Sequence, residues 1–195
     1  MRLEEFEFGR MPDGAPVRLI RAVSSGGLEV SVTDYGATLV SVRLPDREGV
    51  NGEITLGFDT LEGYLGAHPY FGATVGRYAN RINHARFELD GKTYRLTPND
   101  DGHHLHGGRI GFNRVLWSPK ITADADSARI ELSHVSPDGH EGYPGELSVT
   151  VAYTAGDDNT LVIDYTATTD KPTPVNLTNH TYWNLNAPGT DVRDH

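Results

Sequence analysis

Apolar and polar residues alternate along much of this 195-residue chain, and that alternation predicts β-strands. Segments with an apolar residue at every second position are found in Leu28–Val32, Val40–Val42, Ile130–Leu132, Leu147–Tyr153 and Leu161–Tyr165. No window of useful length places apolar residues at i, i+3, i+4 and i+7 between credible helix caps. The pattern therefore predicts an all-β fold, a large antiparallel β-sandwich.

A β-hairpin is predicted between Phe87 and Leu96, with Asp90-Gly91 at its tip. A tight mirror-image turn needs positive φ at both central residues, which Asp-Gly tolerates. The 22 glycines and 11 prolines are scattered along the chain, as expected for many short strands joined by turns. Because no repeat or linker is evident, residues 1–195 are predicted to form a single domain.

Composition narrows the classes of partner. The chain has 17 basic and 27 acidic residues, and this excess of acid argues against nucleic acid or an anionic membrane surface as the main partner. The absence of cysteine excludes disulfides, thiolate zinc sites and cysteine nucleophiles. Met1–Glu7 is acidic, and no apolar run approaches the roughly 18 residues of a membrane span, so we expect a cytoplasmic protein.

Three histidines fall in His103-His104-Leu105-His106. On a strand, His104 and His106 would point to one face and could bind a metal. No carboxylate follows within the next six residues, so no metal is expected, and a surface cluster without a role stays open for His103. Gly107-Gly108 after His106 permits close approach of a ligand or another strand.

Three further segments carry candidate chemistry, each with a plainer alternative. Arg77–Ile82 offers the donors and the amide that sugar hydroxyls need, or is a turn with solvated arginines. Asp138–Gly145 rims a pocket or is an ordinary loop. Asn176–Leu185 is rich in asparagine, and Tyr182 or Trp183 could stack on a sugar ring; an edge strand is the alternative. No serine-hydrolase elbow, P-loop or dinucleotide motif is present.

Taken together, these segments resemble the aldose 1-epimerase (galactose mutarotase) family in order and spacing over nearly the whole chain. The matching pieces are Pro69–Gly72, Gly76–Ile82, Leu105–Gly108 with Gly111-Phe112 and Trp117, Gly142–Gly145, and Asn176–His180 with Tyr182 and Asn184-Leu185.

The resemblance implies a galactose mutarotase-like β-sandwich that interconverts the α and β anomers of a hexose such as galactose or glucose, without a cofactor. It assigns His180 as the residue that protonates the ring oxygen and His106 as its neighbour at the same oxygen. Histidine ordinarily titrates near pH ~6.5, which suits reversible proton transfer at neutrality. The predicted substrate-binding residues are Arg81, Asn80, Tyr182 and Asn179.

The resemblance also implies a missing part. The family's general base is a glutamate that would lie beyond His195, so the chain is expected to be a truncated, catalytically impaired N-terminal part. Nothing in the sequence supports Glu141 as a substitute. An incomplete sandwich would expose strand edges and favour self-association.

Three alternatives stay open: a non-catalytic carbohydrate-binding β-sandwich, a hexose-phosphate 1-epimerase, or a structural domain with incidental histidines. The second would need converging basic residues, for which the candidates are Arg77, Arg81, Arg86 and Arg109.

Overall fold

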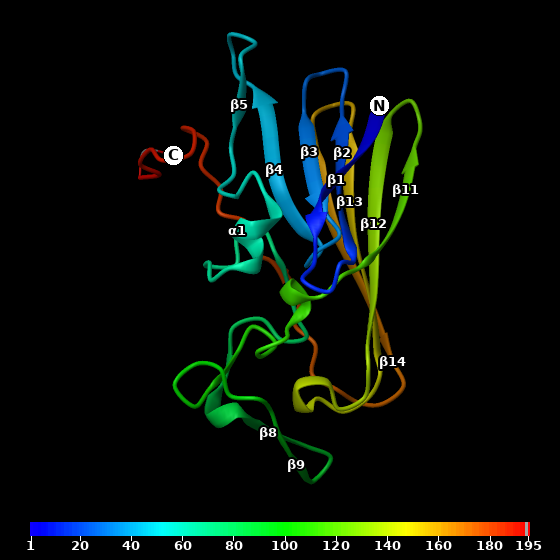
Figure 1. Ribbon diagram of the computed structural model, residues 1–195, viewed down its shortest axis with the longest axis vertical. Coiled ribbons are helices and arrows are strands. Elements are labelled where there is room, and N and C mark those ends of the chain that lie inside the picture. The colour runs from blue at the N-terminus through cyan, green and yellow to red at the C-terminus, as the bar shows by residue number, and fades with distance from the viewer. Residues whose placement is uncertain (194) are drawn as a thin grey trace.

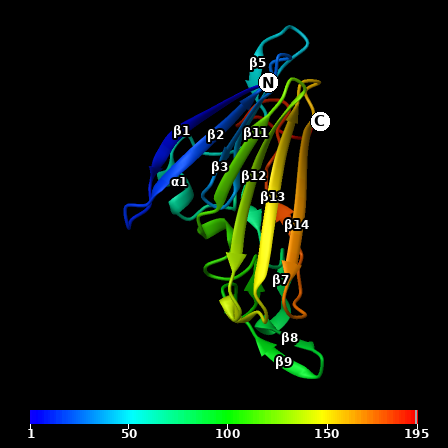
Figure 2. The ribbon, with the colours of Figure 1, turned by 90° about the vertical axis from the view of Figure 1, so that its right-hand side faces the viewer.

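Two antiparallel sheets form the body of the computed structural model, which describes residues 1–193 and 195 (Figure 1). The first sheet has the order β1 (Arg2–Arg10), β2 (Pro16–Val23), β3 (Glu29–Thr33), β4 (Thr38–Pro45) and β5 (Asn51–Glu53). The second has the order β11 (Ser118–Ala123), β12 (Ser127–Ser136), β13 (Leu147–Gly156) and β14 (Leu161–Thr169), which lie side by side in Figure 2. The predicted all-β sandwich is confirmed.

The main core lies between the two sheets. Alternate residues of β13, from Leu147 to Tyr153, are fully buried there, as their spacing predicts. Leu161, Ile163 and Tyr165 of β14 pack against the same cluster but are only partly covered. Burying a large apolar side chain stabilises a fold by about 1.5–3 kcal/mol, so this cluster is the main source of stability.

One predicted face is wrong. Alternation places Val40 and Val42 together, yet Val42 lies in the main core and Val40 in a second cluster around α1 (Leu61–Leu65). The pairing of β3 with β4 shifts register between Ser31 and Val32, and a bulge of this kind adds one residue to one strand. The extra residue changes the face on which the following side chains lie.

The remaining elements are short. They are the strands β6 (Thr74–Val75), β7 (Arg81–Ile82), β8 (Arg86–Leu89), β9 (Lys92–Arg95), β10 (His104–Leu105) and β15 (Thr178–Asn179), and the 3-10 turns η1 (Asn83–Ala85), η2 (Phe112–Arg114) and η3 (His140–Gly142). The predicted hairpin is confirmed, since β8 pairs with β9 and Asp90 and Gly91 have φ of 51° and 73°. Within the described residues, the only α-helix has five residues and is too short to cross a bilayer.

Candidate functional site

His106 and His180 come from two separate pairs of short strands. His106 follows β10, which pairs antiparallel with β7, and His180 follows β15, which pairs antiparallel with β6. The two imidazole centroids lie 5.2 Å apart, with the rings nearly perpendicular at 87°. Both side chains line one open cleft of about 640 Å³, together with Ala79, Asn80 and residues 176–182. The structure thus brings together the two histidines that the sequence singled out.

Two glycines permit the close backbone approaches that build this cleft. A Cβ on Gly107 would lie 1.7 Å from the carbonyl oxygen of Gly76, and one on Gly72 would lie 1.8 Å from that of Leu39. Both glycines also have positive φ, which side chains rarely tolerate. The Gly72 amide donates to the carbonyl oxygen of His180 at 3.2 Å, so this approach fixes the backbone of the histidine.

The backbone of Asn80 holds His106 in one tautomer. The Asn80 N–H donates to His106 Nδ1 at 3.0 Å, and the His106 N–H donates back to the Asn80 carbonyl at 3.1 Å. Because Nδ1 accepts this bond, the neutral ring carries its proton on Nε2. His106 therefore presents a neutral N–H donor.

Burial opposes a second proton on His106. Burial first, and then the nearby His180 and Arg81, lower the pKa of His106 to about 4, while Asp100 acts in the opposite direction. Both causes follow from elementary electrostatics, since charge is disfavoured away from water and near other positive charge. At neutral pH His106 is thus a neutral hydrogen-bond donor.

This assignment predicts a measurable loss of stability in mild acid. Burial also lowers the pKa of four other histidines: His68, His104, His134 and His140. The unfolded chain, with ordinary histidines, takes up protons from about pH 6.5 downwards, whereas folded His106 resists them until about pH 4. The free energy of unfolding should therefore fall between pH 6.5 and 4.

The measurement is urea unfolding at pH 7 and pH 5, beside an NMR titration of the His106 imidazole. We expect a lower urea midpoint at pH 5 and a His106 titration near pH 4. An equal or higher midpoint at pH 5 would contradict the prediction, as would titration of His106 near the ordinary histidine value.

Aromatic rings surround the two imidazoles. The Tyr70 ring lies 4.7 Å from that of His106 and 5.6 Å from that of His180. Tyr182 lies 5.3 Å from His180 and is 38% exposed, so one part of its ring is free for a ligand. Tyr182 thus lines the cleft, and a sugar contact from it stays a prediction. Tyr70 belongs to the Pro69–Gly72 motif but was not among the predicted site residues.

Asn179 lies beside His180, but its side chain is occupied by the protein. Its amide nitrogen donates to the Gly72 carbonyl at 3.0 Å and to the Tyr153 hydroxyl at 3.2 Å, and its oxygen accepts from Thr181. An amide has two donors and one acceptor oxygen, and all are used. A sugar contact from Asn179 stays a prediction, and the geometry favours a role in fixing the strand that carries His180.

Arg81 is adjacent to the cleft and is paired at its rim. Its Nε donates to Asp100 Oδ2 at 2.6 Å, and the side chains are 55% and 31% exposed. Arg81 lines a neighbouring apolar cavity of about 520 Å³ with Tyr78 and Phe87, whereas Asn80 lines the histidine cleft. Sugar contacts from Arg81 and Asn80 stay predictions; an exposed ion pair of this kind is weak and can exchange partners.

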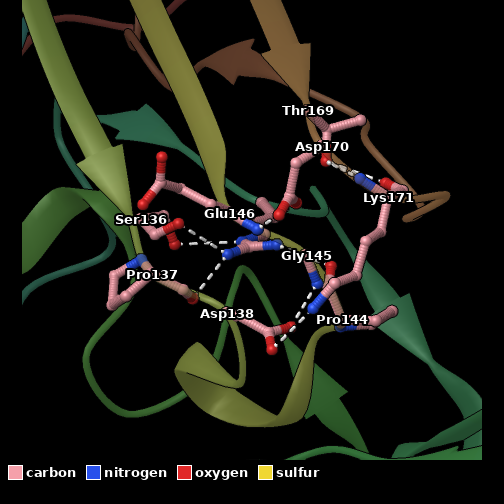
Figure 3. A network of polar contacts seen from close by, with 10 residues as sticks. Ser136, Pro137, Asp138, Pro144, Gly145, Glu146, Thr169, Asp170 and Lys171 are labelled. Carbon is pink, nitrogen blue, oxygen red and sulfur yellow. Dashed lines mark hydrogen bonds and ion pairs between the residues drawn. The ribbon is translucent and has the colours of Figure 1, made fainter.

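Arg77 is buried, with only 2% of its surface exposed, so the alternative of a solvated arginine is wrong for this residue. Its guanidinium donates to the Ser136 hydroxyl and to the carbonyls of Ser136, Pro137 and Pro144 at 2.9–3.1 Å. These acceptors lie at the end of β12 and in the loop that follows it, and Ser136, Pro137 and Pro144 are labelled in Figure 3. Arg77 thus ties the segment leading to Asn80 to the end of the second sheet.

The other histidine of the H-x-H pair is structural. His104 is fully buried, with Nδ1 2.8 Å from the Thr97 carbonyl and Nε2 2.7 Å from the Tyr143 hydroxyl. Because a carbonyl only accepts, Nδ1 carries the proton and Nε2 accepts from Tyr143. His104 does not share the cleft with His106. No three side chains of the metal-binding types converge within the described residues.

Glu141 lies outside the residues that line the cleft. Its Oε1 accepts a hydrogen bond from the Ile110 N–H at 2.8 Å. Its Oε2 occupies the space beside Gly108, where a Cβ would approach it to 2.2 Å. The carboxylate thus fixes the loop after His106.

Comparison with known proteins agrees with this geometry. A family model described as Aldose 1-epimerase matches residues 18–195. Galactose mutarotase of Bos taurus is 47% identical over 189 residues, which cover 96% of this chain and 54% of that protein. Aldose 1-epimerase of Escherichia coli (strain K12) is 42% identical over 184 residues, covering 94% and 52%. The crystal structure of galactose 1-epimerase from Lactobacillus acidophilus NCFM matches with a TM-score of 0.86 at 32% identity, over 94% of this chain and 53% of that one.

The sandwich and its two-histidine cleft define a galactose mutarotase-like β protein. The chain belongs to the aldose 1-epimerase family, which confirms the resemblance read from its motifs. It spans about half the length of the curated relatives it matches.

Proposed function

We propose that this chain carries the proton-donating side of an aldose 1-epimerase site, which interconverts the anomers of a free hexose such as galactose or glucose. The observation that carries the proposal is the convergence of His106 and His180, whose rings lie 5.2 Å apart in one cleft. The printed names of the relatives, galactose mutarotase and aldose 1-epimerase, support the sugar and the reaction.

The reaction requires two proton movements. A proton is placed on the ring oxygen as the bond between that oxygen and C1 breaks, and another leaves the C1 hydroxyl to give the aldehyde. Rotation about C1–C2 and the reverse steps form the other anomer. His180 is proposed to give and regain the first proton, and the neutral Nε2–H of His106 to hold the same oxygen. No cofactor is involved in these steps.

The acceptor of the second proton is not among the described residues that line the cleft, which include no aspartate or glutamate. A downstream glutamate stays an expectation from the family resemblance. The same observation favours a second candidate, a carbohydrate-binding protein that does not catalyse. A hexose-phosphate epimerase is less favoured, because Arg77 is buried against carbonyls and Arg81 is paired with Asp100.

Polarimetry with freshly dissolved α-D-galactose separates these functions. We expect saturation-transfer NMR to detect sugar binding. We expect the chain to shorten the decay of optical rotation only weakly relative to buffer, because no acceptor for the second proton lines the described cleft. Binding with an unchanged decay would favour the non-catalytic alternative. If neither binding nor acceleration is found, with glucose as well as galactose, the proposal is wrong. Cytoplasmic location and self-association through a sandwich edge remain predictions from the sequence.

A further inference from the structure

The imidazole of His180 is held by rings rather than by hydrogen bonds. Within the described part of the chain, no side-chain hydrogen bond is made by either nitrogen of His180, whereas His106 is anchored through Nδ1. Instead, His180 packs on Tyr70 and Tyr182 at similar tilts of 33° and 32°, and the ring of His106 meets it almost at a right angle. The direction of its N–H bond therefore depends on aromatic packing.

Tyr70 contacts both histidines at once. Its ring meets His106 edge-on, at 4.7 Å and 62°, and lies against His180 at 5.6 Å. These separations fall within the range, ~4.5–7 Å, in which aromatic pairs attract and prefer defined orientations. Tyr182, by contrast, contacts His180 and Phe71.

The backbone of Tyr70 is held in an unusual conformation that keeps its ring there. Its φ is 60°, which is uncommon for a bulky residue and is found chiefly where the surroundings impose it. The Ala73 N–H donates to the Tyr70 carbonyl at 3.1 Å, and the Phe71 N–H donates to His68 Nδ1 at 3.2 Å. His68 Nε2 in turn lies 3.2 Å from the Tyr64 carbonyl. The turn is thus fixed on both sides of Tyr70.

We propose that Tyr70 is a positioning residue whose ring holds the imidazoles of His106 and His180 in their nearly perpendicular arrangement. Proton transfer needs the N–H of the acid to lie within hydrogen-bond reach of the sugar oxygen and aimed at it. A small rotation of an unanchored ring misdirects that bond, and misplacement on the scale of 1 Å can cost about a hundredfold in rate. The proposal concerns the ring of Tyr70, so phenylalanine should replace it and leucine should not. The expected effect of Tyr70 on the reaction rate rests on the proposed function, whereas its expected effect on the orientation of the two imidazoles does not.

The experiment compares Tyr70→Phe and Tyr70→Leu with Phe58→Leu as a matched control. Phe58 belongs to the neighbouring aromatic cluster and packs on Tyr64, His68 and Phe71, but it is paired with neither catalytic histidine. The first readout is the NMR spectrum of the imidazoles without sugar. In the wild-type chain, NOEs should join the Tyr70 ring to both His106 and His180. Tyr70→Leu should shift the ring signals of both histidines and weaken the NOE between them, and Tyr70→Phe and Phe58→Leu should not.

The second readout is mutarotation of galactose by the same variants. Tyr70→Leu should lower kcat by about tenfold or more with a smaller change in KM, and Tyr70→Phe should stay within about twofold of wild type.

Two NMR results would overturn the proposal whatever the activity: absence of the Tyr70 NOEs in the wild-type chain, or unchanged imidazole signals in a folded Tyr70→Leu. The wild-type NOEs keep the test decisive should the leucine variant fail to fold. An equal loss in Tyr70→Phe and Tyr70→Leu would assign the effect to the hydroxyl and would also overturn it. Shifted imidazoles in a chain that never accelerates mutarotation would support the role of Tyr70 while refuting the proposed function.

Discussion

Replacing His180 with asparagine is expected to lower the catalysed rate of anomer interconversion by about 10²–10⁴, the usual contribution of a general acid or base. Asparagine keeps a polar group of similar reach but cannot carry a proton back and forth. No carboxylate lines the cleft in the described part of the chain that could act as a replacement acid. His106 cannot replace the acid either, because burial and the Asn80 N–H hold it neutral. The loss should appear in kcat far more than in KM.

Polarimetry at saturating galactose measures this loss, with His84→Asn as the matched control. His84 is exposed and has a φ of 51°, a conformation that asparagine tolerates, so its replacement should leave both the fold and the rate unchanged. His106→Asn provides the contrast, because it removes the donor that is proposed to bind the same oxygen, and it should raise KM as well. If His180→Asn kept most of the wild-type rate, as the control His84→Asn is expected to do, His180 would not be the acid.

Alternation of apolar residues and turn-forming residue pairs predicted the strands and the hairpin turn of this fold. Alternating residues of β13 are buried because one face of a strand must cover the core, and the Asp90-Gly91 turn forms because those two residues accept positive φ. The same reasoning failed at Val40, where a register shift between β3 and β4 changes the face. Nothing in the local sequence marks that bulge.

The histidines show the same limit. Spacing of two on a strand would place His104 and His106 on one face, but β10 ends at Leu105, and His106 takes a φ of 52°. One ring is therefore buried against Tyr143 and the other lies in the cleft. The pairing of His106 with His180 came from the family resemblance, because residues so distant in sequence meet only through the tertiary fold.

Which residues are free to bind a ligand was also hidden from the sequence. Asn179 belongs to a motif rich in ligand-like side chains, yet its amide is fully used by Gly72, Tyr153 and Thr181. Nothing in the local sequence predicts the position of Tyr70 in the site. That position depends on its left-handed backbone and on contacts with His106 and His180, which are far away in the sequence. Composition predicts the chemistry that a segment can offer, and packing decides which groups remain available.

Arg77→Met is expected to lower the free energy of unfolding by about 3–5 kcal/mol, although methionine matches much of the volume of arginine. The buried guanidinium makes four hydrogen bonds to uncharged oxygens, and three of these are backbone carbonyls at the end of β12 and in the loop that follows it. Removing it leaves these buried carbonyls without a donor, and each unsatisfied buried group costs about 1–3 kcal/mol. Burial lowers the pKa of Arg77, while Tyr143, Asp138 and Asp170 act in the opposite direction.

Around this arginine the loop is closed by further charged contacts. Asp138 accepts from the Gly145 N–H and from Lys171 Nζ, at 2.5 and 2.9 Å, and Asp170 accepts from the Glu146 N–H at 2.7 Å (Figure 3). The Asp138–Lys171 pair is exposed, and such pairs are worth little alone, so it cannot hold the loop once Arg77 is gone. Loss of Arg77 should therefore loosen the path from the second sheet to Asn80.

Urea unfolding followed by tryptophan fluorescence, to which buried Trp117 and exposed Trp183 both contribute, measures the loss of stability, and Arg109→Met is the matched control. Arg109 is exposed, so its replacement should change stability by no more than about 0.5 kcal/mol. Because Asn80 anchors His106, the Arg77 variant should also broaden the His106 imidazole signal under conditions where it remains folded. Equal stabilities of Arg77→Met and Arg109→Met would show that the loop carbonyls find other donors, and that the buried arginine does not fix the site.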